Sequence, residues 1–264
     1  MDALVALRLQ IEFGADEALE DAPLGRLRPP LAPGPTPAAR AAAPSAIPPA
    51  APASTAGPAG SAQTAAALAA AADSLPALRA AIAGFEGCAL RATAANLVFA
   101  EGDPAAGLLL IGPAPSDADD RAGRTFAGPA GAYLDQMLAS VGLDRSRLLL
   151  TPLVPWRPPG DRPPSPAERA ACRPFLHRLI ALVRPRRIVL LGALAAQDLL
   201  GAGPGRRAPR GGWRELALPP LDPIPALASQ DPGLLLRNPG PARRRAWADL
   251  RVLRRALDAD VAQL

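Results

Sequence analysis

Three short runs of aliphatic residues, each ending in a loop rich in Gly, Pro or polar residues, constrain the fold of this chain more than any other feature. The runs are GLLLIG at 107–112, RLLLT at 147–151 and RIVLL at 187–191. Helical patterns, with apolar residues at three- and four-residue spacing, are found at 133–141, 167–183, 193–200 and 241–261. Short, wholly apolar strands that alternate with helices are typical of a parallel sheet covered on both faces. The sequence therefore predicts a three-layer α/β/α domain with a central, mostly parallel sheet.

This domain is expected to span residues 63–264. An Ala-rich helical pattern over 63–82, broken or bent around Pro76, is its first predicted element, and weaker strands are predicted at 213–218 and 224–229. The last helix is expected to carry four apolar side chains on one face: Trp247, Leu250, Leu253 and Leu257. Ligands of such sheets meet the loops at the carboxyl ends of the strands, and here these loops begin at Gly112, Thr151, Gly192 and Ser229.

The N-terminal part of the chain has a different composition. Residues 1–20 have the pattern of a short amphipathic helix, too short to be stable unless it docks on something. Residues 21–62 are rich in Ala and hold 11 of the chain's 34 prolines, so they cannot bury enough surface to order and are expected to form a disordered linker. Residues 1–60 could also recruit a protein partner.

The charge and composition of the chain limit the classes of protein to which it can belong. All 29 basic residues are arginines, the net charge is +5, and the excess of positive charge lies after residue 60, which makes phosphate binding plausible. No apolar run approaches the ~20 residues of a membrane-spanning helix. The two cysteines cannot form a disulfide framework. We expect a cytoplasmic, monomeric protein without a membrane segment.

Four loop segments at the ends of successive predicted strands carry a resemblance. They are GPAPSDADDRAGRTFAGPAG at 112–131, LLLTPLVPWRPPGDRPPSPAE at 148–168, RIVLLGALAAQDLLG at 187–201 and QDPGLLLRNP at 230–239. Taken in order over about 84–255, they resemble the family 4 uracil-DNA glycosylases, the bacterial and archaeal type that carries an iron–sulfur cluster. The resemblance implies the glycosylase fold and a DNA-repair hydrolase that flips uracil from DNA, stacks it on an aromatic ring and hydrolyses its N-glycosidic bond.

The resemblance also indicates which residues form the site, and some of the family's site residues are replaced in this chain. In the first motif a proline, Pro113, stands where the family has the glutamate near the attacking water. Asp119 and Asp120 follow in the same loop; they can either orient a water or cap the loop. The residues matched to base binding are Gly112, Ala114, Pro115, Phe126 and Pro152, with Phe126 as the stacking ring.

Two further family side chains are replaced. Pro152 stands in place of the asparagine that reads the uracil edge, so discrimination of uracil is expected to suffer. Asp231 replaces the histidine that donates to the uracil oxygen, a donor whose loss typically costs ~3–4 kcal/mol of transition-state stabilisation. Only a protonated Asp231 could donate in its place, which requires a raised pKa. The sole histidine, His177, is not expected to substitute.

The cluster motif is also incomplete. Cys88 and Cys172 match the first and last of the family's four cluster cysteines, whereas Arg91 and Trp156 occupy the other two positions. Because a [4Fe–4S] cluster is held by four thiolates, the sequence predicts no cofactor. Cys88 and Cys172 are expected to be relict neighbours packed as small apolar residues, with Trp156 filling the vacated volume.

The DNA-facing part is retained in the sequence. Leu234, Leu235 and Arg237 match the loop that wedges into DNA, and Arg157 and Arg210 are expected to supply cations near the same edge. DNA is therefore the expected partner. Three hypotheses remain: a uracil-DNA glycosylase, a catalytically inactive DNA-binding or accessory protein with the same fold, and an interaction module that recruits a partner through residues 1–60.

Overall fold

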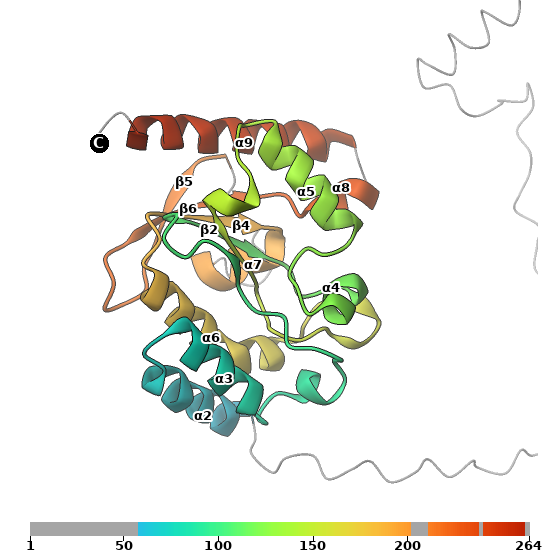
Figure 1. The fold of residues 1–264 in the computed structure, drawn as a ribbon, viewed down its shortest axis with the longest axis vertical. Helices are drawn as coiled ribbons and strands as arrows, with labels where there is room; N and C mark the ends of the chain where they lie inside the picture. The colour runs from blue at the N-terminus through green and yellow to red at the C-terminus, as the bar shows by residue number, and fades with distance from the viewer. Residues whose placement is uncertain (1–57, 202–210, 238–239, 262–264) are drawn as a thin grey trace, which may run out of the picture. The chain divides into compact units, whose positions relative to one another are not determined.

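The computed structural model describes residues 58–201, 211–237 and 240–261, all within one compact unit, Ala51–Leu264 (Figure 1). The predicted helix 1–20, the linker up to residue 57 and Arg210 lie outside the described residues. The helices are α2 Pro58–Ala71, α3 Leu75–Gly84, α4 Asp117–Ala122, α5 Pro129–Ala139, α6 Pro166–Val183, α7 Ala193–Leu200, α8 Pro232–Arg237 and α9 Gly240–Val261, with the short 3-10 turns η1 Ala89–Ala92, η2 Arg145–Arg147 and η3 Pro159–Asp161. The strands are β1 Glu101–Gly102, β2 Leu108–Gly112, β3 Leu149–Pro152, β4 Arg187–Leu191, β5 Trp213–Leu216 and β6 Ile224–Ser229.

The six strands form one sheet in the order β1-β3-β2-β4-β6-β5. The four central strands are parallel, and the short edge strands β1 and β5 run antiparallel to their neighbours. The three apolar runs seen in the sequence are the central strands β2, β3 and β4, and β2 is buried over its whole length. The predicted, mostly parallel sheet is therefore confirmed.

Helices cover both faces of the sheet (Figure 1). One core contains Leu109 and Ile111 of β2 together with residues of α2, α3, α6 and α7. The other contains Leu108 and Leu110 of the same strand together with residues of α5, α8 and α9. Because alternate side chains of a strand point to opposite faces, this division confirms the three-layer α/β/α architecture.

The N-terminal helical region differs from its prediction. It consists of two helices, and the first begins at Pro58, five residues before the expected start of the domain. The second helix is capped by Ser74, whose side chain accepts a hydrogen bond from the N–H of Ala77. Pro76 therefore lies in the first turn of a new helix, where its missing N–H costs nothing, and does not bend a continuous one.

Two other elements correct the sequence reading. The segment 112–131, expected to be a loop, contains the short helix α4, and the strand β1 was not predicted. In α9 the buried side chains include Ala246, Leu250 and Leu253, whereas Trp247 is 46% exposed. The prediction that Trp247 shares the apolar face of this helix is wrong, because Ala246 occupies the position that faces the core.

None of the helices among the described residues is long and apolar enough to cross a membrane.

Candidate functional site

The candidate site lies where the parallel strands end. Gly112 at the end of β2 pairs with Pro152 of β3, and Leu191 of β4 pairs with Ser229 of β6. The next loops also meet, since a Cβ added at Gly192 would lie 3.3 Å from the Cβ of Asp231. The four predicted site loops therefore start from one edge of the sheet.

Phe126 and Gly112 are in direct contact at this edge. A Cβ on Gly112 would lie 2.7 Å from two atoms of the Phe126 ring, so only glycine allows the ring to lie this close to the end of β2. Phe126 is buried, and its backbone has a φ of +53°, a left-handed conformation that is unusual for a bulky residue. The structure thus brings Gly112 and Phe126, two of the residues predicted for base binding, into contact.

Arg145, Asp135 and Gly131 surround Phe126 and support its left-handed backbone conformation. The guanidinium of Arg145 donates hydrogen bonds to the carbonyl oxygens of Phe126, at 2.8 Å, and of Thr125, at 3.3 Å, while Asp135 fixes the same guanidinium at 2.7 Å. Gly131 packs against the same carbonyl so closely that a Cβ there would overlap the Phe126 oxygen. Sequence reasoning missed Arg145, because nothing in its spacing relates it to Phe126.

The carboxylate of Asp119 accepts hydrogen bonds from its own loop. Its Oδ2 accepts hydrogen bonds from the backbone N–H and the hydroxyl of Ser116, at 2.8 and 2.7 Å, and its Oδ1 accepts one from the N–H of Ala127, at 2.6 Å. The bonds with Ser116 form a capping box at the start of α4. The serine-to-aspartate spacing, followed by Gly123, is the signal that could have revealed this helix in the sequence.

Asp120 has a comparable role. Its two carboxylate oxygens accept hydrogen bonds from the N–H groups of Asn96, at 2.9 Å, and Ala95, at 3.1 Å, and its carbonyl accepts one from the Asn96 amide at 2.7 Å. Both aspartates are buried. Of the two alternatives that the sequence left open for this pair, the hydrogen bonds favour loop capping over the orientation of a water.

The prolines at the ends of β2 and β3 bring no polar side chain to the site. Pro152 is buried, and Pro113 is half-buried beside it. The N–H of Leu153 donates to the carbonyl of Gly112 at 3.1 Å, so the two loops are joined through their backbones. Ala114 and Pro115 continue the same apolar wall. The two prolines offer no side-chain donor or acceptor for the edge of a base.

Asp231 is half-buried, whereas the other two aspartates predicted for the site, Asp119 and Asp120, are buried. Its carboxylate accepts a hydrogen bond from the N–H of Gly233 at 2.8 Å, at the start of α8. Burial raises the pKa of Asp231 above its ordinary value, against the opposing effects of this hydrogen bond and of Arg237. A raised pKa increases the protonated fraction, and only the protonated carboxyl can donate a hydrogen bond.

Two buried polar side chains precede Asp231. The Ser229 hydroxyl and the Gln230 amide nitrogen have no hydrogen-bond partner in the part of the chain that the structure describes. Both lie at the carboxyl end of β6, which is the edge that carries the site. The sequence placed Ser229 at the start of a site loop but assigned no role to either side chain, although polar residues at the end of an apolar strand are a usable signal.

The predicted DNA wedge is only partly exposed. Leu234 and Leu236 are 39% and 40% exposed, whereas Leu235 is fully buried in the core beneath α8. The assignment of Leu235 to the DNA-contacting tip is therefore wrong; it anchors the helix, and Leu236 takes its place on the surface. Arg237 is exposed at the end of α8.

The predicted cations differ in their availability. Arg157 is paired with Asp117 at 2.8 Å and with Asp161 at 2.7 Å, so DNA would have to compete for it. On α9, Arg243 lies 5.6 Å from the ring of Tyr133. Four other arginines of α9 are exposed and form no ion pair with any described residue: Arg244, Arg245, Arg251 and Arg255.

The two cysteines are buried neighbours. Cys172 donates a hydrogen bond to Cys88 over 3.7 Å, which lowers the pKa of Cys88 and, together with burial, raises the pKa of Cys172. Trp156 is buried in the same core, whereas Arg91 points outward to Glu86 at 3.5 Å. Within the described ranges no three His, Cys, Asp or Glu side chains are grouped to hold a metal ion. Two thiols do not fit a cluster that needs four thiolates.

His177 lies on α6, away from the strand ends that carry the site. Its side chain is half-buried, and burial lowers its pKa.

Comparison with known proteins agrees with this geometry. The model of the uracil DNA glycosylase superfamily matches residues 99–251. The Type-4 uracil-DNA glycosylase of Pyrobaculum aerophilum is 37% identical over 134 residues, which cover 51% of this chain and 68% of that protein. Those of Sulfurisphaera tokodaii and Archaeoglobus fulgidus are 38% and 40% identical, over 46% and 42% of this chain and 55% of each relative. The family model matches more than half of the chain, and the matched loops lie at the carboxyl edge of the sheet. This chain therefore belongs to the uracil DNA glycosylase superfamily.

Proposed function

We propose that this chain is a DNA-repair protein that binds DNA at the carboxyl edge of its sheet and accepts an extruded base against Phe126. The contact between Gly112 and the Phe126 ring carries the proposal, because it keeps an aromatic face at the strand end while an unusual backbone conformation is held in place. Strained backbone is retained where the surrounding structure over-determines it, which is typical of functional sites. The Type-4 uracil-DNA glycosylase relatives support the repair function.

The surface beside the site suits DNA. Leu234 and Leu236 form an exposed apolar tip on α8, suited to replace an extruded base in the stack. Arg237 follows the tip, and the unpaired arginines of α9 continue the positive charge beyond it. Cations without an acidic partner can neutralise phosphates and release counterions, which makes affinity depend on salt.

The chemistry of uracil excision is the part that the site lacks. The carboxylates of Asp119 and Asp120 in α4 are occupied by backbone N–H groups, and prolines stand at the two positions matched to the water-activating and base-reading side chains. The function that the geometry supports best is therefore recognition of DNA without efficient hydrolysis. Loss of a single oxyanion donor already slows an enzyme about 100- to 1000-fold.

One observation favours a second candidate, a glycosylase that works on the acid side of neutrality. Burial raises the pKa of Asp231, and a protonated Asp231 could donate to the pyrimidine oxygen that gains charge as the bond breaks. Such an enzyme would become faster as the pH falls.

A single-turnover excision assay tests both candidates. Protein in excess is mixed with a labelled oligonucleotide that contains one uracil, single-stranded or opposite guanine, and abasic sites are cleaved with alkali. The same samples are examined by gel shift at several salt concentrations. Asp231→Ala and Asp231→Asn are run beside the wild type.

DNA binding without cleavage in the wild type supports the recognition protein. Cleavage that increases toward acidic pH and disappears in both Asp231 variants supports the acid-side glycosylase. No gel shift even at low salt would contradict both candidates and would favour an interaction module that works through residues 1–60.

A further inference from the structure

Cys88 and Cys172 are the only cysteines of the chain, and their Sγ atoms lie 3.7 Å apart. The two residues are separated by 84 positions, so the contact is made by the tertiary fold. Cys88 precedes η1, with an extended backbone, and Cys172 lies within α6. The proposed function uses neither thiol.

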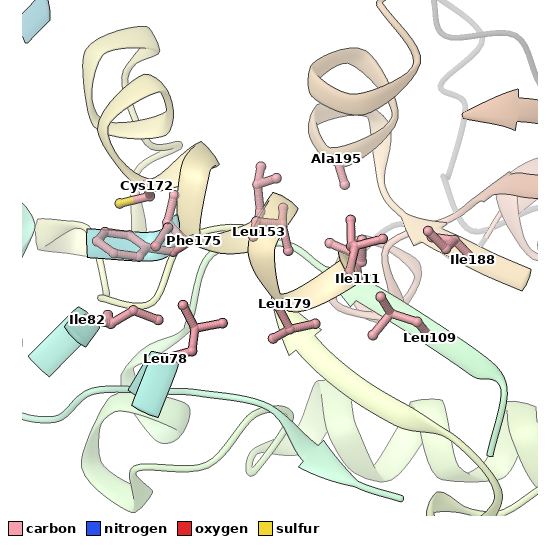
Figure 2. Packing of buried hydrophobic residues seen from close by; sticks show 14 of the residues in the cluster. Leu78, Ile82, Leu109, Ile111, Leu153, Cys172, Phe175, Leu179, Ile188 and Ala195 are labelled. Atoms are coloured by element: carbon pink, nitrogen blue, oxygen red, sulfur yellow. The ribbon is translucent and has the colours of Figure 1, made fainter. Parts of the chain in front are cut away.

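The surroundings of the pair are apolar and closely packed. Phe85 and Phe175 flank it with their rings edge to face, 5.1 Å between centroids. Figure 2 shows Cys172 and Phe175 on the same side of α6, toward Ile82 of α3. Trp156 is packed into the core and Arg91 faces outward, and among the residues that the structure describes no group of His, Cys, Asp or Glu side chains takes the place of the two cysteines. The place matched to an iron–sulfur cluster is therefore a closed dithiol.

Little movement separates the two thiols from a covalent bond. A disulfide has an S–S length of about 2.05 Å, so the sulfurs must approach by roughly 1.7 Å, which a rotation of the side chains with a small backbone shift can supply. Cys88 lies outside the regular helices, with φ −123° and ψ 121°, so a small change of its backbone does not disturb an α-helix.

A cavity next to Cys172 can hold a small reagent. Cys172 lines a cavity of about 20 Å³, together with Ile82, Pro152 and Phe175. A cavity of this volume holds one water-sized molecule. Hydrogen peroxide is only slightly larger than water, whereas a protein or a large thiol reagent cannot enter.

We propose that Cys88 and Cys172 are an oxidation site for small hydroperoxides and form an intramolecular disulfide. One thiolate attacks the peroxide O–O bond to give a sulfenic acid and release hydroxide, which takes up the thiol proton to form water. The second thiol then displaces the sulfenic oxygen as a second water while the S–S bond forms. Both sulfurs are oxidised and both peroxide oxygens are reduced; a dithiol reductant reverses the change.

The bond would join two parts of the domain. It would tie the residue that precedes η1 to α6. Four residues after the end of η1, the backbone N–H of Asn96 donates a hydrogen bond to Asp120 in the site loop. Because the crosslink closes a long loop in the unfolded chain, oxidation is expected to raise the midpoint of thermal unfolding by several degrees.

The test uses the purified full-length chain, reduced and then exposed to increasing hydrogen peroxide. Remaining thiols are blocked with a maleimide under denaturing conditions, and intact mass and tryptic peptides are measured. Trypsin should yield the segment 80–91 linked to 170–178, since Arg173 precedes a proline and is not cleaved. Cys88→Ser and Cys172→Ser are the matched single-thiol controls, and the wild type in denaturant is the positive control for crosslinking.

The expected result is loss of both maleimide labels, the linked peptide, and a higher thermal midpoint that a dithiol reductant returns to the starting value. Neither single-thiol variant should show that shift. Retention of both labels in the folded protein, at a peroxide dose that crosslinks the denatured chain, would overturn the proposal. So would sulfinic acid on one cysteine without the linked peptide.

Discussion

Arg145 donates a 2.8 Å hydrogen bond to the carbonyl oxygen of Phe126, a residue whose backbone is in the left-handed region. The same guanidinium is fixed by Asp135, so an ion pair between α5 and η2 supports the backbone conformation of the aromatic residue in the site. A bulky residue in this region costs of order 1–3 kcal/mol, which its neighbours must offset. Arg145 is thus a positioning residue for Phe126.

Arg145→Ala should lower the free energy of unfolding by about 1–3 kcal/mol, because it leaves two carbonyls and a carboxylate without their donor. Urea unfolding measures the change. Arg147→Ala is the matched control, since the exposed side chain of Arg147 makes one hydrogen bond to the described residues, to the Gly142 carbonyl, and its loss should stay within about 0.5 kcal/mol. Equal effects of the two substitutions would show that Arg145 has no special role.

Gly131→Ala should be strongly destabilising. The added Cβ would overlap the Phe126 carbonyl and would also lie 2.9 Å from the Arg145 guanidinium, so the backbone of the site loop must move. Thermal unfolding and gel shift with uracil DNA report the two consequences. Gly84→Ala, at a helix position where nothing lies within 4 Å of the new Cβ, should be neutral or slightly stabilising.

Asp231→Asn should change how stability depends on pH. Burial raises the folded-state pKa of Asp231, so its contribution to stability is present at acidic pH and is lost as the pH rises through that pKa. Asparagine can keep the cap on α8 without ionising. The stability of the variant relative to wild type should therefore increase from acidic to neutral pH in denaturant titrations. A difference that does not vary with pH would show that Asp231 has an ordinary pKa.

Neighbouring leucines of α8 should respond differently to truncation. Leu235→Ala removes a fully buried side chain and should cost about 2–5 kcal/mol of unfolding free energy. Leu234→Ala should cost less than about 0.5 kcal/mol, because this side chain is exposed, yet it should weaken DNA binding. Denaturant unfolding and gel shift separate the two effects; unchanged DNA affinity in Leu234→Ala would argue against the wedge.

Restoring the missing thiols tests the assignment of the cluster positions. The double variant Arg91→Cys/Trp156→Cys would supply four thiolates, the set that a [4Fe–4S] cluster needs. After anaerobic reconstitution we expect bound iron and the visible absorbance of a cluster in the variant and neither in the wild type. A variant that takes up no iron would mean that the two positions are assigned wrongly.

The strands β2, β3 and β4 were predictable because each is a short apolar run buried on both faces, whereas β1 has only two residues and no such run. The hydrogen-bond partners of the site loop were not, since Asp120 is held by Asn96, a residue 24 positions away. The exposure of single helix residues was equally inaccessible. Trp247 was misplaced because a helical pattern one residue out of phase looks almost the same. Leu235 was misplaced because the match to the wedge motif does not show which of its leucines faces the core. The prolines that replace polar family residues at 113 and 152, and the aspartate that replaces the family histidine at 231, were visible in the sequence alone.

Proline at positions 113 and 152 has a consequence for stability. Proline restricts the unfolded chain, and at these strand ends it adds no polar group that must be dehydrated. Placing an asparagine or a glutamate at either position would introduce that cost. Under the proposed function, a single such replacement would therefore lower stability without by itself supplying the other polar groups that base excision needs.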